Sequence, residues 1–203
     1  MQVADFAKGI ELDSWIEKIY LESGGGGGNH ESYELMAAYL SQAEFRKDAE
    51  PIVLFIADER MYNYVEEDEA KIYGIKNFGR DVNGFDQLRK TFKDNVYVFL
   101  NKYEGDYNFK EWNAVLPAEH TIKIKEEKAI VDLMLGVLAL IGKKSLKTYA
   151  LDMGARGQDT KRITGVTAAL EGLSKALVPI ENINKHLPVS TNAKKSSTKN
   201  NRL

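Results

Sequence analysis

Five consecutive glycines are the first feature of the sequence that could do chemistry, because a predicted helix follows them. The stretch LESGGGGGNHESYEL contains Gly24, Gly25, Gly26, Gly27 and Gly28. A glycine-rich loop before a helix can hold a phosphate, since the free N–H groups and the dipole of the helix favour an anion. The motif G-x-x-x-x-G-K-[ST] is missing, however, and Glu31 would repel a phosphate. A nucleotide-dependent hydrolase or transferase that uses this loop is therefore the alternative hypothesis.

Asp58 is a candidate metal ligand, because it follows the continuous apolar run of residues 52–57. Such a run is typical of a parallel strand buried on both faces, and ligands of α/β sheets bind at the carboxyl ends of strands. Mg²⁺ prefers oxygen ligands, so Asn29 or Ser32 from the glycine loop could join Asp58 at a cation site. The alternative is that Asp58 caps a following helix, which residue types alone favour.

The remaining polar residues form no recognisable catalytic arrangement of nucleophile, base and orienting group. We expect Glu59 and Arg60 to be solvated or paired, and the lone His30 and His120 to have no metal-binding role. Asp132 is unusual because it lies within a strongly apolar helical run. It could face solvent, cap a neighbouring element or point into a cleft, and we favour the first two. The sequence therefore favours a protein that is not an enzyme.

The pattern of apolar residues predicts strands that alternate with helices. Strands are expected at residues 2–6, 52–57, 96–100 and, near an edge, 120–124; helices are expected near residues 12–19, 31–45, 62–73, 84–93, 112–116, 126–141, 143–153 and 158–177. This alternation indicates an α/β sandwich with a largely parallel sheet. We expect one domain over residues 1–178 and a basic, disordered tail over residues 179–203.

Composition and charge exclude several classes of protein. The chain has 203 residues, enough for one domain, and no cysteine, so disulfides and thiolate metal sites are absent. We expect no membrane segment, and the absence of a signal-peptide pattern favours a cytoplasmic location. Five Lys or Arg and no acid lie from Lys185 onward, so the rest of the chain carries about −7. An acidic body argues against nucleic acid as the main partner.

Three segments together resemble the later part of a von Willebrand factor A-like (vWA) domain of the intracellular bacterial and phage type. They are QVADF, then LDSWIEKIYLESGGGGGNHESYEL, then a buried strand that ends in FIADE. The resemblance spans residues 2 to about 140. It implies a three-layer, Rossmann-like vWA-type sandwich with a mainly parallel sheet, to which this chain adds C-terminal helices.

The resemblance also implies a protein-interaction module with a metal-ion-dependent adhesion site. Asp58 matches the ligand of its third loop, and Asn29 lies in the second loop, where the family has Thr or Asp. The first-loop motif D-x-S-x-S is missing. We therefore expect a degenerate site that binds Mg²⁺ weakly or not at all. The implied partner is a protein, for which an AAA-type ATPase is a candidate because several family members work beside one.

The N-terminal part of the family's fold has no counterpart in this sequence, because the chain begins at the strand that QVADF resembles. Residues 2–6 would then lack a neighbouring strand, and an unpaired strand edge invites another chain. Three explanations stay open: a truncated or split reading frame, which we favour; a second polypeptide that supplies the missing half; or a different pairing of residues 2–6.

Overall fold

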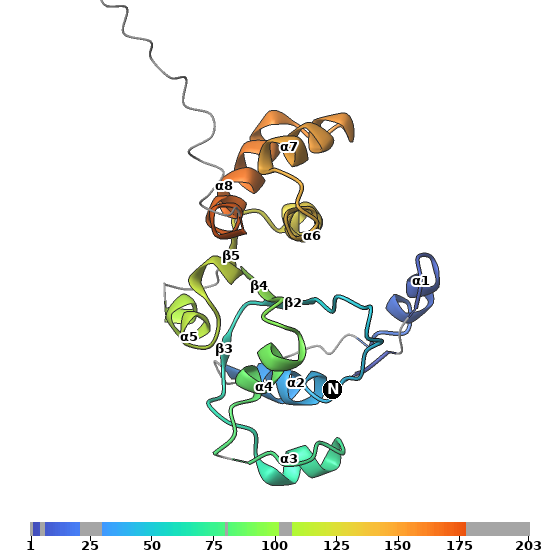
Figure 1. The fold of residues 1–203 in the computed structure, drawn as a ribbon, viewed down its shortest axis with the longest axis vertical. Helices are drawn as coiled ribbons and strands as arrows, with labels where there is room; N and C mark the ends of the chain where they lie inside the picture. Colours follow the sequence, from blue (N-terminus) through green and yellow to red (C-terminus); the bar gives the residue numbers. More distant parts are fainter. Residues whose placement is uncertain (1, 5–6, 21–29, 80, 102–106, 178–203) are drawn as a thin grey trace, which may run out of the picture.

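A computed structural model describes residues 2–4, 7–20, 30–79, 81–101 and 107–177 (Figure 1). The glycine run, Asn29 and the basic tail lie outside the described residues. The order of elements is α1 (Glu11–Ile16), β1 (His30–Glu31), α2 (Tyr33–Leu40), β2 (Val53–Ala57), β3 (Arg60–Met61), α3 (Glu67–Ile72), α4 (Gly84–Thr91), β4 (Val96–Asn101), α5 (Tyr107–Val115), the 3₁₀ turn η1 (Ala118–His120), β5 (Thr121–Ile124), the 3₁₀ turn η2 (Glu127–Ala129), α6 (Ile130–Ile141), α7 (Leu146–Ala155) and α8 (Thr160–Leu177).

The central sheet has three parallel strands in the order β2-β4-β5. Strand β4 lies in the middle and is buried over its first five residues, as its apolar sequence VYVFL predicts. The expected edge position of residues 120–124 is confirmed, since among the described strands β5 pairs only with β4. A separate two-residue parallel pairing joins β1 to β3. The prediction of an α/β fold with a parallel sheet is therefore confirmed.

Helices cover both faces of this sheet, which gives a Rossmann-like layout (Figure 1). Phe55 and Val98 on one face pack among the side chains of α2, α4 and α5. The fully buried Trp112 belongs to the same cluster. Tyr97 and Phe99 on the other face pack against α6, α7 and α8. We call these helix groups the α2–α4–α5 layer and the α6–α7–α8 layer.

The connections explain why the last three helices are needed. The crossover from β2 to β4 carries α4, and the crossover from β4 to β5 carries α5, and both helices pack on the same face. Parallel strands added in one direction with crossovers of one hand place their helices on one face. The second face is covered by the α6–α7–α8 layer, whose apolar side chains remove it from water.

Two expectations about strands are wrong in the described residues. Residues 2–4 are exposed and form no strand; instead the Gln2 side chain accepts a hydrogen bond from the Tyr20 backbone N–H at 2.8 Å and donates one to the Tyr20 carbonyl at 2.7 Å. Strand β2 is not buried on both faces, because Ile56 is 56% exposed. Ile56 is exposed because β2 lies at the edge of the described sheet, where it pairs only with β4.

Candidate functional site

Asp58 lies directly after β2 and is held by the start of α2. The Tyr33 hydroxyl donates a hydrogen bond to Asp58 Oδ1 at 3.1 Å and accepts one from the Asp58 backbone N–H at 3.3 Å. Burial raises the pKa of Tyr33, so its hydroxyl stays protonated and remains a donor. The Asn108 side chain of α5 donates to the Asp58 carbonyl at 2.9 Å. The end of β2 and the beginning of α2 are therefore in direct contact.

Asp58 caps no helix, so that interpretation is wrong. The chain continues from it into β3, which lies beside α5 (Figure 1). The indole N–H of Trp112 donates to the Glu59 carbonyl at 3.3 Å, and Arg60 Nε donates to Glu111 Oε1 at 2.7 Å. The expectation that Arg60 is paired is confirmed.

Glu34 is a buried carboxyl that the sequence analysis missed. It lies one residue after Tyr33 and is 4% exposed. Its Oε2 accepts the backbone N–H of Tyr62 at 3.2 Å, while burial raises its pKa to about 7. Glu34 lies four residues before the fully buried Ala38, on the same side of α2. That spacing on an apolar helix face is the signal that could have identified it.

Glu34 opens onto an acidic cleft with a volume of about 370 Å³. The cleft combines carboxylates, tyrosines and one imidazole, and its lining residues are His30, Ser32, Glu34, Tyr62, Asn63, Tyr64, Glu66 and Glu69. The rings of His30 and Tyr62 are stacked at 5.3 Å between centroids. The negative charge of Glu69 adds to the rise in the pKa of Glu34. We call this feature the acidic cleft.

The expected site residues that the structure describes do not share one site. Ser32 lines the acidic cleft, whereas Asp58 faces Tyr33 and does not line it. Glu31 is an exposed residue of β1, paired in register with Met61. The members of the glycine loop and Asn29 lie outside the described residues.

The other two polar residues considered from the sequence, His120 and Asp132, are held by neighbouring parts of the fold. The His120 ring lies 4.4 Å from that of Tyr97, its Nδ1 is 3.0 Å from the Val96 carbonyl oxygen, and burial lowers its pKa. Asp132 is 3% exposed, so the expectation that it faces solvent is wrong. Two arginines from α8 and the end of α7 meet it instead, and their positive charges compensate a carboxylate that is removed from water.

Within the part of the chain that the structure describes, no three His, Asp or Glu side chains are grouped so that they could hold a metal ion. Across the same residues, no helix has both the length and the apolar character needed to cross a bilayer. Comparisons with protein-family models, with curated proteins and with solved structures gave no match to this chain.

Proposed function

We propose that this protein is a non-enzymatic, vWA-like interaction module that binds another protein at the carboxyl end of β2. The observation that carries the proposal is the contact of Asp58 with Tyr33, which joins the strand end to the helix that follows the glycine loop. The same two segments, FIADE and ESYEL, carry the resemblance to the vWA family. Ligands of parallel α/β sheets bind at this edge.

The contact also supports a degenerate metal site. Asp58 Oδ1 already accepts the Tyr33 hydroxyl, and the carboxyl of Glu34, with a pKa of about 7, is only partly ionised at neutral pH. Mg²⁺ needs ionised oxygen ligands that replace part of its water shell. We therefore propose weak Mg²⁺ binding and a recognition mode that does not depend on a bridging metal.

The acidic cleft supports a cationic side chain of the partner as the group that is recognised. Glu69 and the partly ionised Glu34 supply negative charge, and the stacked rings of His30 and Tyr62 supply a flat surface beside it. A lysine or arginine gains from both features, through ion pairing and through cation–π contact. A partner segment with exposed Lys or Arg therefore fits this site, and an AAA-type ATPase is one candidate for that partner.

Exposed apolar residues near the N-terminus also support an interaction module. Helix α1 buries none of its residues. The large apolar side chains within this helix and next to it are exposed, namely Ile10, Leu12, Ile16, Ile19 and Tyr20. Three of these side chains, Leu12, Ile16 and Ile19, line one surface hollow, and gathered apolar surface of this kind marks contact sites for other proteins.

A metal titration tests the degenerate site. We expect Mg²⁺ or Mn²⁺ to shift the melting temperature of the full chain by no more than about 1 °C at 5 mM, because binding stabilises only above Kd. A large shift that Asp58→Ala abolishes would contradict this and favour a metal-dependent adhesion site. Saturable binding of ATP or GTP that Gly26→Val abolishes would favour the nucleotide-dependent enzyme instead.

A peptide-display selection on the full chain tests cation recognition. We expect selected peptides to share a Lys or Arg, and their affinity to fall roughly tenfold in the double variant Glu34→Gln/Glu69→Gln, since each lost ion pair costs about 0.5–1 kcal/mol. Asp68→Asn is the matched control, because Asp68 precedes Glu69 on α3 but does not line the cleft. Equal losses in the control and the double variant would count against the acidic cleft as the site.

A further inference from the structure

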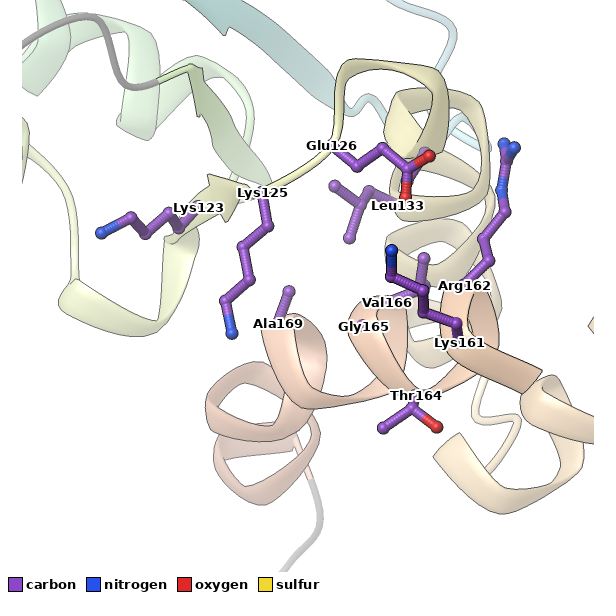
Figure 2. A pocket seen from close by; sticks show the side chains of 11 residues that line it. Lys123, Lys125, Glu126, Leu133, Lys161, Arg162, Thr164, Gly165, Val166 and Ala169 are labelled. Carbon is purple, nitrogen blue, oxygen red and sulfur yellow. The ribbon is translucent and has the colours of Figure 1, made fainter. Parts of the chain in front are cut away.

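A second cavity, with a volume of about 440 Å³, opens between the end of β5 and the first turns of α8 (Figure 2). We call it the β5–α8 cavity. Its rim is basic, with Lys123 and Lys125 on one side and Lys161 and Arg162 on the other. The rest of its lining is mostly apolar or small and includes Ala129, Leu133, Gly165, Val166 and Ala169. Small-molecule sites have volumes of about 300–1,000 Å³ and such apolar linings.

Two of the four cations already have partners. Lys123 points away from the cavity in Figure 2, and its ammonium lies 5.3 Å from the centre of the Phe109 ring. Arg162 Nε donates to Asp132 Oδ2 at 2.7 Å, and another N–H of its guanidinium donates to the Lys128 carbonyl. Neither side chain is available to a ligand without losing these contacts.

Lys125 and Lys161 are different, because no hydrogen bond or ion pair engages either one in the described ranges of the chain. They come from opposite sides of the cavity, one just after β5 and one from the first turn of α8 (Figure 2). Glu126 is the single acid among the lining residues. The N-terminal end of α8 adds a partial positive charge, which Asp159 reduces by accepting the backbone N–H of Arg162.

We propose that the β5–α8 cavity binds a small amphipathic organic anion. The apolar body of the ligand packs on Ala129, Gly165 and Ala169, and its single carboxylate, sulfonate or phosphate group lies between Lys125 and Lys161. The cavity is at the carboxyl end of β5, which is the edge where ligands of parallel α/β sheets bind. The proposal does not depend on the acidic cleft, since the two features share no residue.

Charge argues against the chain's own C-terminal residues as the occupant. The sequence from Lys185 onward carries five Lys or Arg and no acid, so it would be repelled by Lys125 and Lys161. A free small molecule with one negative group has the complementary charge.

Two fluorescent probes that differ in one group test the proposal on the full chain. Anilinonaphthalene sulfonate has an aromatic body and a sulfonate, and N-phenyl-1-naphthylamine has the same body without charge. We expect the sulfonate to bind saturably, and Lys125→Met and Lys161→Met each to weaken it roughly fivefold, as expected for loss of one ion pair. Binding of the neutral probe should change less than about twofold, because Met keeps the apolar stem.

Further variants separate charge from shape. Glu126→Gln should strengthen sulfonate binding about twofold to threefold, because it removes the one opposing charge, whose effect at the surface is small. Gly165→Leu should weaken both probes, since a Cβ at Gly165 meets no atom within 4 Å and the side chain would fill the cavity. Gly172→Leu is its control, because Gly172 on α8 has the same open space but does not line the cavity.

Lys147→Met is the control for charge, since Lys147 is an exposed residue of α7 outside the cavity. The proposal is overturned if Lys147→Met weakens sulfonate binding as much as Lys125→Met and Lys161→Met do. It is also overturned if Gly165→Leu leaves both probes bound as in the unmodified chain. Circular dichroism of each variant confirms that the fold is retained.

Discussion

Among the described residues, each of the two helical layers buries one carboxyl group, but the two groups have opposite surroundings. Glu34 in the α2–α4–α5 layer is 4% exposed and accepts a backbone N–H, while Asp132 in the α6–α7–α8 layer is 3% exposed and meets Arg156 and Arg162. Burial raises the pKa of Glu34 to about 7, and the negative charge of Glu69 adds to the rise.

Burial alone therefore does not determine whether a carboxyl group has a structural or a functional role. Asp132 Oδ2 lies 2.7 Å from Arg162 Nε, its Oδ1 lies 3.3 Å from Arg156, and its backbone carbonyl accepts the Tyr149 hydroxyl. These contacts join α6, the end of α7 and α8. Asp132 is therefore a structural link, whereas Glu34 can change its charge near neutral pH beside an open cleft.

The largest effect is expected from Asp132→Ala. The variant loses two hydrogen bonds between charged groups, to Arg156 and Arg162, and at about 1.5–2 kcal/mol each this costs about 3–4 kcal/mol of unfolding free energy. Urea unfolding monitored by circular dichroism measures this loss. Asp152→Ala is the matched control, since it breaks the more exposed pair with Lys144 in the same layer and should cost less than about 1 kcal/mol. Similar losses in both variants would remove the distinction drawn for Asp132.

The next effect is a pH dependence of stability that Glu34→Gln should reduce. The pKa of Glu34 in the folded protein, about 7, is above its ordinary value of 4.5, so between these pH values the folded state binds more protons than the unfolded state. Stability from this group is therefore fully present below pH 4.5, falls as the pH rises through 7 and then levels off, by about 2–3 kcal/mol in total.

Urea unfolding of the unmodified chain and of Glu34→Gln at pH 5 and pH 8 measures this dependence. We expect the variant to lose less stability between the two pH values. Asp68→Asn, whose side chain is almost fully exposed on α3, should follow the unmodified chain. Parallel behaviour of all three proteins would mean that Glu34 is ionised normally.

The smallest effect concerns how closely α4 approaches α2. A Cβ at Gly84 would lie 2.8 Å from the Glu34 carbonyl oxygen and 3.2 Å from the Ala38 backbone N, and backbone atoms cannot move as a flexible side chain can. Gly84→Ala should therefore cost about 1–2 kcal/mol through forced separation of the helices. Gly172→Ala, in the open space on α8, should instead stabilise by roughly 0.5–1 kcal/mol. Thermal melts of both variants would show equal shifts if the close approach were absent.

Much of the layout could be predicted because it depends on local patterns. The apolar runs at residues 52–57 and 96–100 became β2 and β4, and the long apolar run before residue 142 became α6. Residues 2–4 were expected in a strand from their alternation, but alternation does not supply a neighbouring strand, and they form none. Asp58 was correctly expected at a strand end, and its contact with Tyr33 was not foreseen.

The sequence by itself determined the α/β class, the parallel sheet and the strand end at Asp58, because periodicity and continuous apolar runs are properties of neighbouring residues. Only the tertiary structure decided which groups Glu34 and Asp132 contact. The partners of Asp132 lie 24 and 30 residues away, and Tyr62 lies 28 residues after Glu34. Whether a buried carboxyl meets guanidinium groups or backbone N–H groups depends on which distant segments pack together, and at Glu34 burial without a cation raises the pKa.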